Sequence, residues 1–432
     1  MSLFLGIDLG TSYFKIGLFD HDGALRGLGR VAVEPVCRAE GRYELATTAF
    51  WRKVRDGLAS ALAEAGASAA AIRGISYSSQ ANTFLLLDNR GAEITPLIFW
   101  HDQRARPLGA EIVAFGNTPE HARKTGLTGI APEGAPSKCR WFAETERAIW
   151  AKAKRVMTIS DYFTWCLTGE LYGDAGTAAL TGLYDLAARS WWPEALHVFG
   201  IDSAQLSKPL LPGSSCGKTT TRASEFLGIP QDTPFAVGSL DHHAAAIGSG
   251  IGSFADASLS TGTVLAALVL APDILPAVSR IHGPHMNGGG YYRLAFDPNG
   301  AGELEEYQRH HAPALTLDQL VEEGDCAGSS QHGAAVRRIL DRIVTTQRDL
   351  LAGLSVGDAP TAIAATGGGS RSPLLLQMQA NALGATVVTS HGSERACLGA
   401  ATFAAVAAGE YESLPLATAA MVHRAKEYIP AL

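Results

Sequence analysis

The sequence predicts an α/β protein of two domains. Its 432 residues exceed what one hydrophobic core usually supports. Short apolar segments typical of buried strands alternate along the chain with segments of helical periodicity. The strand–turn–strand plan of residues 3–19 also recurs weakly at 257–270. A shift to Gly- and Ala-rich composition near 245–255 sets the predicted boundary, giving domains at 1–247 and 248–432.

The overall composition excludes several classes of function. A hydrophobic content of 47% with 18% charged residues is typical of a globular protein. The net charge of −7 gives no excess of positive charge that would favour binding to nucleic acid. We find neither a secretory signal near Met1 nor an apolar run long enough for a bilayer, so we expect a cytoplasmic protein without membrane or nucleic-acid partners. Free thiols and no zinc site are expected from six cysteines without a CxxC pair: Cys37, Cys139, Cys166, Cys216, Cys326 and Cys397.

The N-terminal segment is predicted to begin with three strands. Residues 3–8 form a buried strand, 13–19 a second and 24–33 a third, with turn chemistry at His21-Asp22-Gly23 between the last two. Residues 50–65 form an amphipathic helix. Between the first two strands, Gly10, Thr11 and Ser12 allow backbone amides and hydroxyls to approach an anion closely, so this turn can cradle a phosphate.

Polar residues follow two of the next three predicted strands, which cover residues 72–77, 83–87 and 97–99. Ser78 to Asn82 follow the first strand, and the cluster from Trp100 to Arg104 follows the last. Such strand ends are where α/β sheets bind ligands. Asn82 and Trp100 suit hydroxylated ligands, because they offer an amide and an aromatic face. Two alternatives remain open: Trp100 packs in the core, and Asp102 forms a structural ion pair with Arg104.

The middle of the chain is predicted to be mostly helical between residues 118 and 170. One helix opens at Pro136, and another has Ser160 as its N-cap and ends at Gly169. Residues 213–219 resemble a Walker loop, but the spacing is one residue short and no strand–turn–helix context follows. We interpret this stretch as a surface loop.

The stretch around Asp241 organises the rest of the chain. Residues 235–237 form a short buried strand that Gly238 ends, and small apolar residues after Asp241 can form a helix. Asp241 can simply cap that helix. A functional role is favoured by two similar turns, at Asp8 to Ser12 and at Ser260 to Thr263. Three polar turns at strand ends suit a nucleotide-phosphate site, in which the carboxylate lies where a hydroxyl meets a phosphate.

The C-terminal part continues this alternation. Residues 257–260 and 263–270 are predicted strands, and 331–354 form a long helix. Strand 361–365 runs into a turn containing Gly367, Gly368 and Gly369, and a helix follows at 374–383. A last helix of small residues begins at Glu394, and the residues after 400 are predicted to be a short helical tail.

In order and spacing, these motifs resemble the FGGY carbohydrate kinases, over nearly the whole chain. That resemblance implies two actin-like (ribonuclease H-like) ATPase domains with an active-site cleft between them, and ATP and Mg²⁺ as cofactors. The matching features are Asp8-Leu9-Gly10-Thr11 with Lys15, the region of Gln80, Trp100 to Arg104, Lys138 with Trp141, Asp161-Tyr162, Leu167 to Gly169, Gly238 to Asp241, Thr261 to Thr263, and Gly367 to Ser372.

The resemblance also implies a role for individual residues. Asp241 matches the catalytic base, which accepts the proton of the attacking hydroxyl. Asp8 matches the position that holds Mg²⁺ through water. The implied phosphate and adenosine contacts are Thr11, Ser12, Lys15, Thr261, Gly262, Thr263, Gly368, Gly369 and Ser372. The implied substrate contacts are Gln80, Asn82, Trp100, Asp102, Asp241 and His242.

The sugar site departs from known members of the family. Glycerol kinases follow the glutamine with Arg-Glu, whereas this chain has Ala81-Asn82, which argues against glycerol. Xylulokinases have Met-His-Gly there, and Ala81-Asn82-Thr83 departs from that motif, so this feature does not support xylulose. A ketose such as xylulose stays the expected substrate, with fuculose-like sugars, ribulose and tetroses as alternatives. Asp241-His242 resembles fuculokinase-like members. The chain is shortened around 285–330, so the wall of the sugar pocket is expected to be unusual. The sequence leaves open whether a homodimer forms.

A second class of function also remains open. An actin-like ATPase can act as a chaperone or filament protein with water as acceptor, and an inactive relative can act as a sugar sensor. A carboxylate placed for an alcohol acceptor favours the kinase. The pairs His242-His243 and His310-His311 lack the helical spacing of metal ligands.

Overall fold

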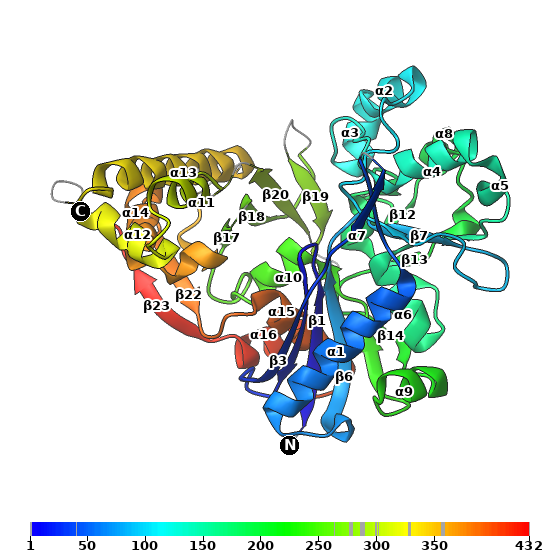
Figure 1. The fold of residues 1–432 in the computed structure, drawn as a ribbon, viewed down its shortest axis with the longest axis horizontal. Helices are drawn as coiled ribbons and strands as arrows, with labels where there is room; N and C mark the ends of the chain where they lie inside the picture. Colours follow the sequence, from blue (N-terminus) through cyan, green and yellow to red (C-terminus); the bar gives the residue numbers. More distant parts are fainter. Residues whose placement is uncertain are drawn as a thin grey trace. The chain divides into compact units, whose positions relative to one another are not determined.

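The computed structural model describes residues 2–39, 41–262, 264–275, 280–285, 290–298, 300, 302–326, 330–355 and 359–431. The chain forms two compact units (Figure 1). Unit 1 comprises Met1–Gly248, Ala271–Tyr292 and Ala396–Met421, and unit 2 comprises Ser249–Leu270, Arg293–Arg395 and Val422–Leu432. The chain therefore returns to unit 1 twice after leaving it.

Unit 1 is built around a mixed sheet, whose central strand is buried along its whole length. The predicted strands at 3–8, 13–19, 24–33, 72–77, 83–87 and 97–99 and the helix at 50–65 are confirmed within a few residues. The strands of unit 1 are β1 (Leu3–Leu9), β2 (Tyr13–Phe19), β3 (Leu25–Ala32), β4 (Val36–Ala39), β5 (Arg42–Leu45), β6 (Ile72–Ser79), β7 (Phe84–Leu87), β8 (Leu97–Ile98), β9 (Arg155–Thr158), β10 (Tyr172–Asp174), β11 (Tyr184–Asp185), β12 (Ser190–Trp191), β13 (Lys208–Leu210), β14 (Ser215–Lys218), β15 (Pro234–Ala236), β16 (Ser239–Leu240) and β19 (Ile281–Pro284).

The helices of unit 1 range from one turn to the nineteen residues of α1. They are α1 (Thr47–Ala65), α2 (Ala110–Gly116), α3 (Pro119–Thr125), α4 (Ala135–Thr145), α5 (Arg147–Trp150), α6 (Ile159–Thr168), α7 (Ala175–Ala179), α8 (Pro193–Phe199), α9 (Thr221–Leu227), α10 (Asp241–Ile247), α15 (Arg395–Ala407) and α16 (Leu414–Met421), with 3-10 turns η1 (Ala69–Ala71) and η2 (Ser203–Gln205).

The main sheet of unit 1 has the strand order β14-β15-β6-β1-β2-β3, with β16 also paired to β6. Glycines let helix backbones approach it. A Cβ atom at Gly29 of β3 would lie 1.8 Å from the carbonyl oxygen of Gly57 in α1, which lies across the sheet in Figure 1. A Cβ atom at Gly6 of β1 would lie 1.9 Å from the carbonyl oxygen of Cys397 in α15. Helix packing on this sheet therefore depends on the absence of side chains at these positions.

A second sheet in unit 1 has the order β4-β5-β8-β7-β9. Its apolar side chains join α4 and α8 in a separate core that includes Phe84, Ile98, Phe142 and Phe199. This sheet carries the turn that follows β8, where Trp100 to Arg104 lie.

Unit 2 contains its own sheet, in which six strands are neighbours in the order β20-β18-β17-β21-β22-β23. The long helix α13 buries an apolar stripe that includes Val336, Ile339 and Leu340. The elements are β17 (Ala257–Thr261), β18 (Leu265–Ala271), β20 (Tyr291–Asp297), β21 (Ala362–Thr366), β22 (Thr386–Ser390), β23 (Arg424–Tyr428), α11 (Gly302–His311), α12 (Leu317–Glu323), α13 (Gly333–Leu354), α14 (Pro373–Leu383), η4 (Gly324–Cys326) and η5 (Gly368–Arg371).

The prediction of a mostly helical stretch between residues 118 and 170 is confirmed by α3, α4, α5 and α6, with β9 lying between the last two. Three local predictions were wrong. The N-cap of α6 is Thr158, whose hydroxyl accepts from the Asp161 amide, so Ser160 lies inside the helix. Residues 215–218 form a strand paired with β15 and not a surface loop. The tail after residue 400 includes β23, which pairs antiparallel with β22. In each case a partner distant in sequence, or a neighbouring cap, decided the local structure.

Among the residues that the structure describes, no helix combines the length and apolar character needed to span a bilayer.

A substitution at Gly399 in α15 tests whether the helices of unit 1 pack as closely as the structure shows. A Cβ atom there would lie 2.0 Å from the carbonyl oxygen of Ala244 in α10, so Gly399→Ala must push the two helices apart. We expect the free energy of unfolding, measured by urea titration, to fall by about 1–3 kcal/mol. Gly353→Ala in α13, where nothing lies within 4 Å of the new Cβ, is the control and should not destabilise. An unchanged midpoint for Gly399→Ala would contradict this packing.

Candidate active site

Asp8 lies near the carboxyl end of β1, beside groups from both neighbouring strands. The register pairs Asp8 with Lys15 of β2 and with Ser78 of β6. The Ser78 hydroxyl donates to Asp8 Oδ1 at 2.9 Å, and Lys15 Nζ lies 3.9 Å from Oδ2. Asp8 is 7% exposed. Strand pairing therefore holds a nearly buried carboxylate next to one cation.

The turn after β1 is held by Gln80 at the end of β6. A Cβ atom at Gly10 would lie 2.8 Å from the Tyr13 carbonyl oxygen, so the turn requires a glycine. Gln80 Nε2 donates to the Gly10 carbonyl at 3.1 Å, and its Oε1 accepts from the Thr11 and Thr83 hydroxyls at 3.3 and 2.9 Å. Gln80, predicted as a substrate contact, is buried and its amide is engaged in bracing the turn.

Trp100 links the second sheet to this turn. Its backbone amide donates to the Thr83 hydroxyl at 3.0 Å, and its indole Nε1 donates to the Thr11 hydroxyl at 2.9 Å. Trp100 is 42% exposed, so the alternative of a core-packing tryptophan is wrong. The Nε1 edge of the indole is therefore hydrogen-bonded to Thr11, while much of the ring is exposed to solvent.

Asp102 is fully buried in an ion pair. Arg104 donates to both of its oxygens at 2.8 Å and also to Glu44, and the Tyr43 amide donates to Oδ2 at 2.8 Å. Burial alone would raise the pKa of Asp102, but the hydrogen bonds and charge of Arg104 lower it below its usual value. The structure favours the alternative of a structural ion pair for Asp102.

Lys138 in α4 is a residue whose role the sequence did not reveal. Its side chain is fully buried, and Nζ donates to the carbonyls of Phe99 and Trp100 at 2.7 and 3.1 Å. Burial lowers the pKa of Lys138 to about 7, although the charge of Asp102 opposes this shift. Its position on the buried face of a helix, beside Cys139 and Phe142, was the available signal. Lys138 fixes the backbone that carries Trp100.

Asn82 has the left-handed backbone conformation, with φ of 60°. Its Nδ2 donates to the Leu180 carbonyl at 3.2 Å, and its Oδ1 accepts from the Ala135 amide at 3.0 Å. The side chain therefore joins the end of α7 to the start of α4, and it stays partly exposed.

Asp241 is the first residue of α10, directly after β16. The N-cap is Leu240, so the capping alternative for Asp241 is not what the structure shows. Oδ1 of its partly exposed carboxylate accepts from the His242 amide at 2.7 Å. Strand β16 runs parallel to β6, and β6 runs parallel to β1. The carboxyl ends of parallel strands meet at one sheet edge, which brings together Asp8, Gln80 and Asp241.

The two histidines after Asp241 have different surroundings. His242 is partly exposed, whereas His243 is fully buried. His243 Nδ1 lies 2.7 Å from the Ser239 hydroxyl, and its Nε2 lies 3.0 Å from Nδ1 of His285. Burial, reinforced by His285, lowers the pKa of His243 well below its usual value. The imidazole is therefore a neutral bridge between β16 and the residue after β19.

Unit 2 brings two glycine-containing turns together. Strands β17 and β21 are parallel, so their carboxyl ends share an edge. A Cβ atom at Gly367 would lie 2.5 Å from the Thr261 carbonyl oxygen, and one at Gly369 would lie 2.7 Å from Thr261 Cβ. The turn after β21 therefore packs directly on the end of β17.

The predicted nucleotide contacts of unit 2 differ in exposure. The Thr261 side chain is buried and accepts from Gln347 Nε2 at 2.8 Å and Gln379 Nε2 at 3.3 Å. Gly368 is exposed, and Gly262 and Gly369 are partly exposed. The Ser372 hydroxyl accepts from the Leu375 amide and caps α14. Thr263 lies outside the described residues.

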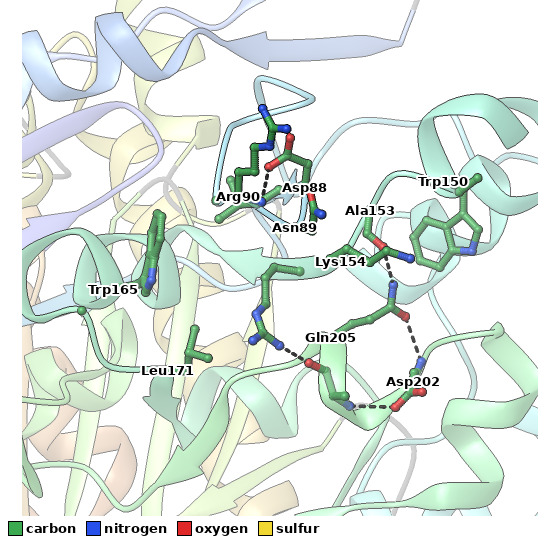
Figure 2. A pocket seen from close by; sticks show the side chains of 16 residues that line it. Asp88, Asn89, Arg90, Trp150, Ala153, Lys154, Trp165, Leu171, Asp202 and Gln205 are labelled. Atoms are coloured by element: carbon green, nitrogen blue, oxygen red, sulfur yellow. Dashed lines mark hydrogen bonds between the residues drawn. The ribbon is translucent and has the colours of Figure 1, made fainter.

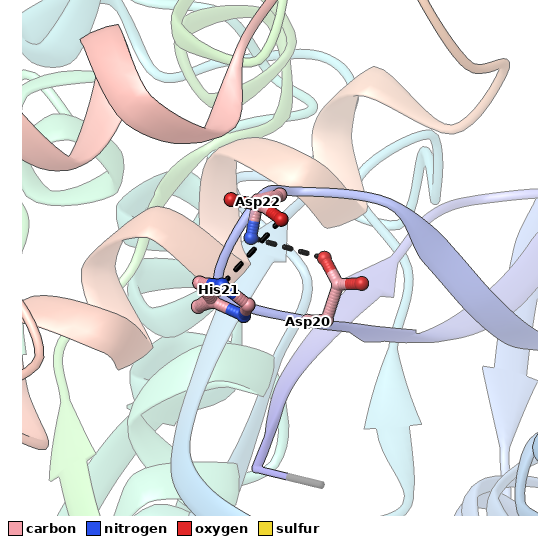
Figure 3. A group of neighbouring side chains, drawn as sticks. All are labelled: Asp20, His21 and Asp22. Atoms are coloured by element: carbon pink, nitrogen blue, oxygen red, sulfur yellow. Dashed lines mark hydrogen bonds and ion pairs between the residues drawn. The ribbon is translucent and has the colours of Figure 1, made fainter.

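A possible metal-ligand group lies at the β2–β3 hairpin, at the opposite end of β2 from Lys15. Asp20, His21 and Asp22 come together there (Figure 3). Asp20 already accepts from the amides of Asp22 and Ala24 and pairs with Arg26. His21 and Asp22 are exposed. The cluster is accounted for by turn formation.

Two surface pockets of unit 1 also lie apart from the predicted site residues. One has a volume of about 810 Å³ and lies between the β7–β8 loop and η2 (Figure 2). Polar groups on its wall bond to each other: Gln205 Nε2 donates to the Ala153 carbonyl, and the Asp202 amide donates to Gln205 Oε1. The other, of about 530 Å³, is lined by Trp51, Tyr162 and Arg222 among others. Neither lining contains a predicted site residue.

Comparison with known proteins gives matches along most of the chain. The N-terminal domain of the FGGY family of carbohydrate kinases matches residues 3–248, and the C-terminal domain of that family matches residues 281–408. A xylulose kinase of Lactococcus lactis is 25% identical, over 100% of this chain and 93% of that protein. An L-xylulose/3-keto-L-gulonate kinase of Escherichia coli is 24% identical, over 99% and 92%. The ligand-bound xylulose kinase structure from Lactobacillus acidophilus shares the fold, with a TM-score of 0.88 at 22% identity over 100% and 94%.

Lys138 is expected to make stability depend on pH. Its pKa is about 7 in the folded protein against an ordinary 10.5, so between these values the unfolded chain holds a proton that the folded protein has lost. Stability should therefore rise with pH through this window. In urea titrations, Lys138→Met should be less stable and should lose this rise, a slope of up to about 1.4 kcal/mol per pH unit. The exposed Lys154→Met is the control, and equal slopes for wild type and Lys138→Met would contradict the assignment.

Proposed function

This chain belongs to the FGGY family of carbohydrate kinases, and from that premise we propose that it transfers the γ-phosphoryl group of ATP to a hydroxyl of a small ketose such as xylulose. The kinase has the actin-like ATPase fold of its family. The observation that carries the proposal is the convergence of Asp8 and Asp241 at the carboxyl ends of parallel strands in unit 1. Fuculose-like sugars, ribulose and tetroses are the alternative substrates.

Asp241 is the proposed catalytic base. Phosphoryl transfer asks the protein mainly to position the reactants and to neutralise charge, and one carboxylate near the acceptor hydroxyl can take its proton. One oxygen of Asp241 accepts from the His242 amide, and the side chain remains accessible. The hydrogen bond from the His242 amide restrains Oδ1, while the carboxylate stays accessible to a reacting hydroxyl.

The proposed phosphate contacts come from both units. In unit 1 they are the amides and hydroxyls of Thr11 and Ser12 together with Lys15, whose ammonium lies near Asp8. In unit 2, the exposed Gly368 and the partly exposed Gly262 and Gly369 leave backbone accessible to adenosine or phosphate. The proposed contacts of unit 2 are Thr261, Gly262, Thr263, Gly368, Gly369 and Ser372.

Asp8 fits the chemistry of a magnesium site. Mg²⁺ prefers carboxylate oxygens and keeps several waters, and Asp8 offers a carboxylate that Ser78 holds in place. Bound through water at Asp8, the ion would neutralise charge on the transferring phosphate. Lys15 contributes a second positive charge on the same side of the sheet.

The proposed sugar site uses the half-exposed Trp100 and the partly exposed Asn82 and His242. Gln80 and Asp102 contribute by holding the turns that present these side chains. The relatives named as xylulose kinases support a ketose substrate, although Ala81-Asn82-Thr83 departs from the xylulokinase motif. Ala81-Asn82 argues against glycerol. In this proposal, residues 1–247 bind the sugar and carry the first phosphate turn and the base, and residues 248–432 bind ATP.

A location in the reducing cytoplasm is also part of the proposal, because free thiols are typical of proteins in that compartment. The cysteines whose side chains the structure describes are free thiols: Cys139, Cys166, Cys216 and Cys397.

The substrate is tested by measuring ADP release in a coupled assay with a panel of ketoses, aldoses and polyols. We expect ATP turnover to rise at least about tenfold above the rate without sugar for one ketose, because the acceptor hydroxyl completes the reactive geometry. Glycerol should give no rise. ATP turnover that is independent of every sugar would contradict the proposal and would favour an actin-like ATPase that uses water.

Asp241→Asn tests the catalytic base. The change keeps size and polarity but removes the proton acceptor, so we expect kcat to fall by about two to four orders of magnitude with a nearly unchanged KM for the sugar. Asp22→Asn, in the exposed hairpin of Figure 3, is the matched control and should keep wild-type kinetics. Near-normal turnover in Asp241→Asn would assign the base elsewhere.

A further inference from the structure

Tyr292 carries a buried hydroxyl that packing does not explain. The side chain is fully buried, and its hydroxyl has no hydrogen-bond partner within the part of the chain that the structure describes. Buried polar groups are almost always paired, because an unpaired one loses its bonds to water without replacement. A phenylalanine would fill the same space without that penalty, so the hydroxyl calls for a functional explanation.

Tyr292 lies in the part of β20 that belongs to unit 1, and its ring is held between two elements of that unit. It lies against the neutral imidazole of His243, with centroids 4.6 Å apart and planes 30° apart. On β19, a Cβ atom at Gly283 would lie 2.2 Å from the Tyr292 hydroxyl oxygen, so that position needs a glycine. His243 is in turn bonded to Ser239 and His285. The hydroxyl therefore has a fixed position. The His243 ring that packs on Tyr292 belongs to a residue two positions after Asp241.

The charges of two carboxylates affect the pKa of this hydroxyl. Burial and then the charges of Asp174 and Asp241 raise the pKa of Tyr292, so the group stays protonated and remains a donor. A Cβ atom at Gly176 would lie 3.4 Å from the Tyr292 hydroxyl oxygen and 3.6 Å from the amide nitrogen of Leu240. Because Leu240 immediately precedes Asp241, the donor lies beside the start of α10.

The two carboxylates differ in the bonds they already accept. Asp174 Oδ1 accepts from the Thr177 amide at 2.7 Å, and its Oδ2 accepts from the Thr177 and Tyr77 hydroxyls at 2.8 and 3.3 Å. For Asp241, the structure shows the single bond from the His242 amide to Oδ1. A carboxylate can accept about four hydrogen bonds, so Asp241 has the greater remaining capacity.

We propose that Tyr292 is a positioning residue for phosphoryl transfer, whose hydroxyl donates to the Asp241 carboxylate in the catalytic complex. This inference rests on the proposed role of Asp241 as the base. Hydrogen bonds of catalytic groups are often loose without substrate and tighten in the reactive complex. A second donor, besides the His242 amide, would fix the carboxylate's rotation and point its remaining lone pairs at the sugar hydroxyl.

The test is Tyr292→Phe, because a catalytic role and a packing role predict different results. We expect kcat to fall about tenfold or more, with little change in the KM for the sugar, since a bond to a charged group is lost in the reactive complex. The midpoint of thermal unfolding should stay equal or rise, because the variant removes an unpaired buried hydroxyl.

Two tyrosines provide matched controls. Tyr77→Phe removes a buried hydroxyl that has a partner, Asp174, so its unfolding midpoint should fall. Tyr291→Phe, at the adjacent and partly exposed position, should keep wild-type kcat and midpoint. Wild-type kcat in Tyr292→Phe would overturn the inference, and so would a fall in kcat matched by an equal fall in the folded fraction.

A double variant separates this inference from the proposed function. In an Asp241→Asn background, adding Tyr292→Phe should lower the residual kcat less than twofold, because the two residues act as one unit. An independent tenfold loss in that background would overturn the positioning role. Failure of the proposed function would be seen separately, as a wild-type enzyme that phosphorylates no sugar in the panel.

Discussion

Parallel backbone pairing of β1, β6 and β16 is the constraint on which the candidate site of unit 1 depends. Hydrogen bonding between these strands fixes which residues become neighbours at the sheet edge, so Asp8, Ser78 and Asp241 are brought to the same edge by the backbone. Gly238 shows how tight this pairing is, because a Cβ atom there would lie 1.8 Å from the Tyr77 carbonyl oxygen. The site is therefore as rigid as the sheet that presents it.

Much of the polarity around the site serves to hold turns in place. Gln80, Lys138 and Asp102 are buried and bonded to protein groups, whereas Trp100 keeps much of its ring in solvent. A buried polar group must be satisfied internally, so these residues form bonds to backbone that would otherwise be lost. Gln80 braces the turn after β1, and Lys138 and Asp102 brace the turn that carries Trp100. Exposure thus separates residues that can touch a ligand from those that only support them.

Sequence patterns predicted the fold well, because hydrophobic periodicity and glycine turns are local signals. They also predicted the turns at Asp8 and Asp241 and left the ion pair of Asp102 as an alternative, which the structure favours. They failed where the partner is distant: β14 pairs with β15, and β23 pairs with β22. The same reason hid Tyr292, since nothing near it in the sequence shows that its side chain is enclosed. For Lys138, its neighbours on the helix indicate burial, but its partners, the carbonyls of Phe99 and Trp100, are distant in sequence. The roles assigned to the site residues stay predictions.

Helices α15 and α16 cover parts of a sheet whose first strand, β1, lies far earlier in the chain. Gly6 meets Cys397, and a Cβ atom at Gly23 would lie 1.9 Å from the carbonyl oxygen of Met421. During synthesis, apolar faces of this sheet therefore stay uncovered until the ribosome has made α15 and α16. A nascent chain arrested before those two helices is a natural client for holding chaperones.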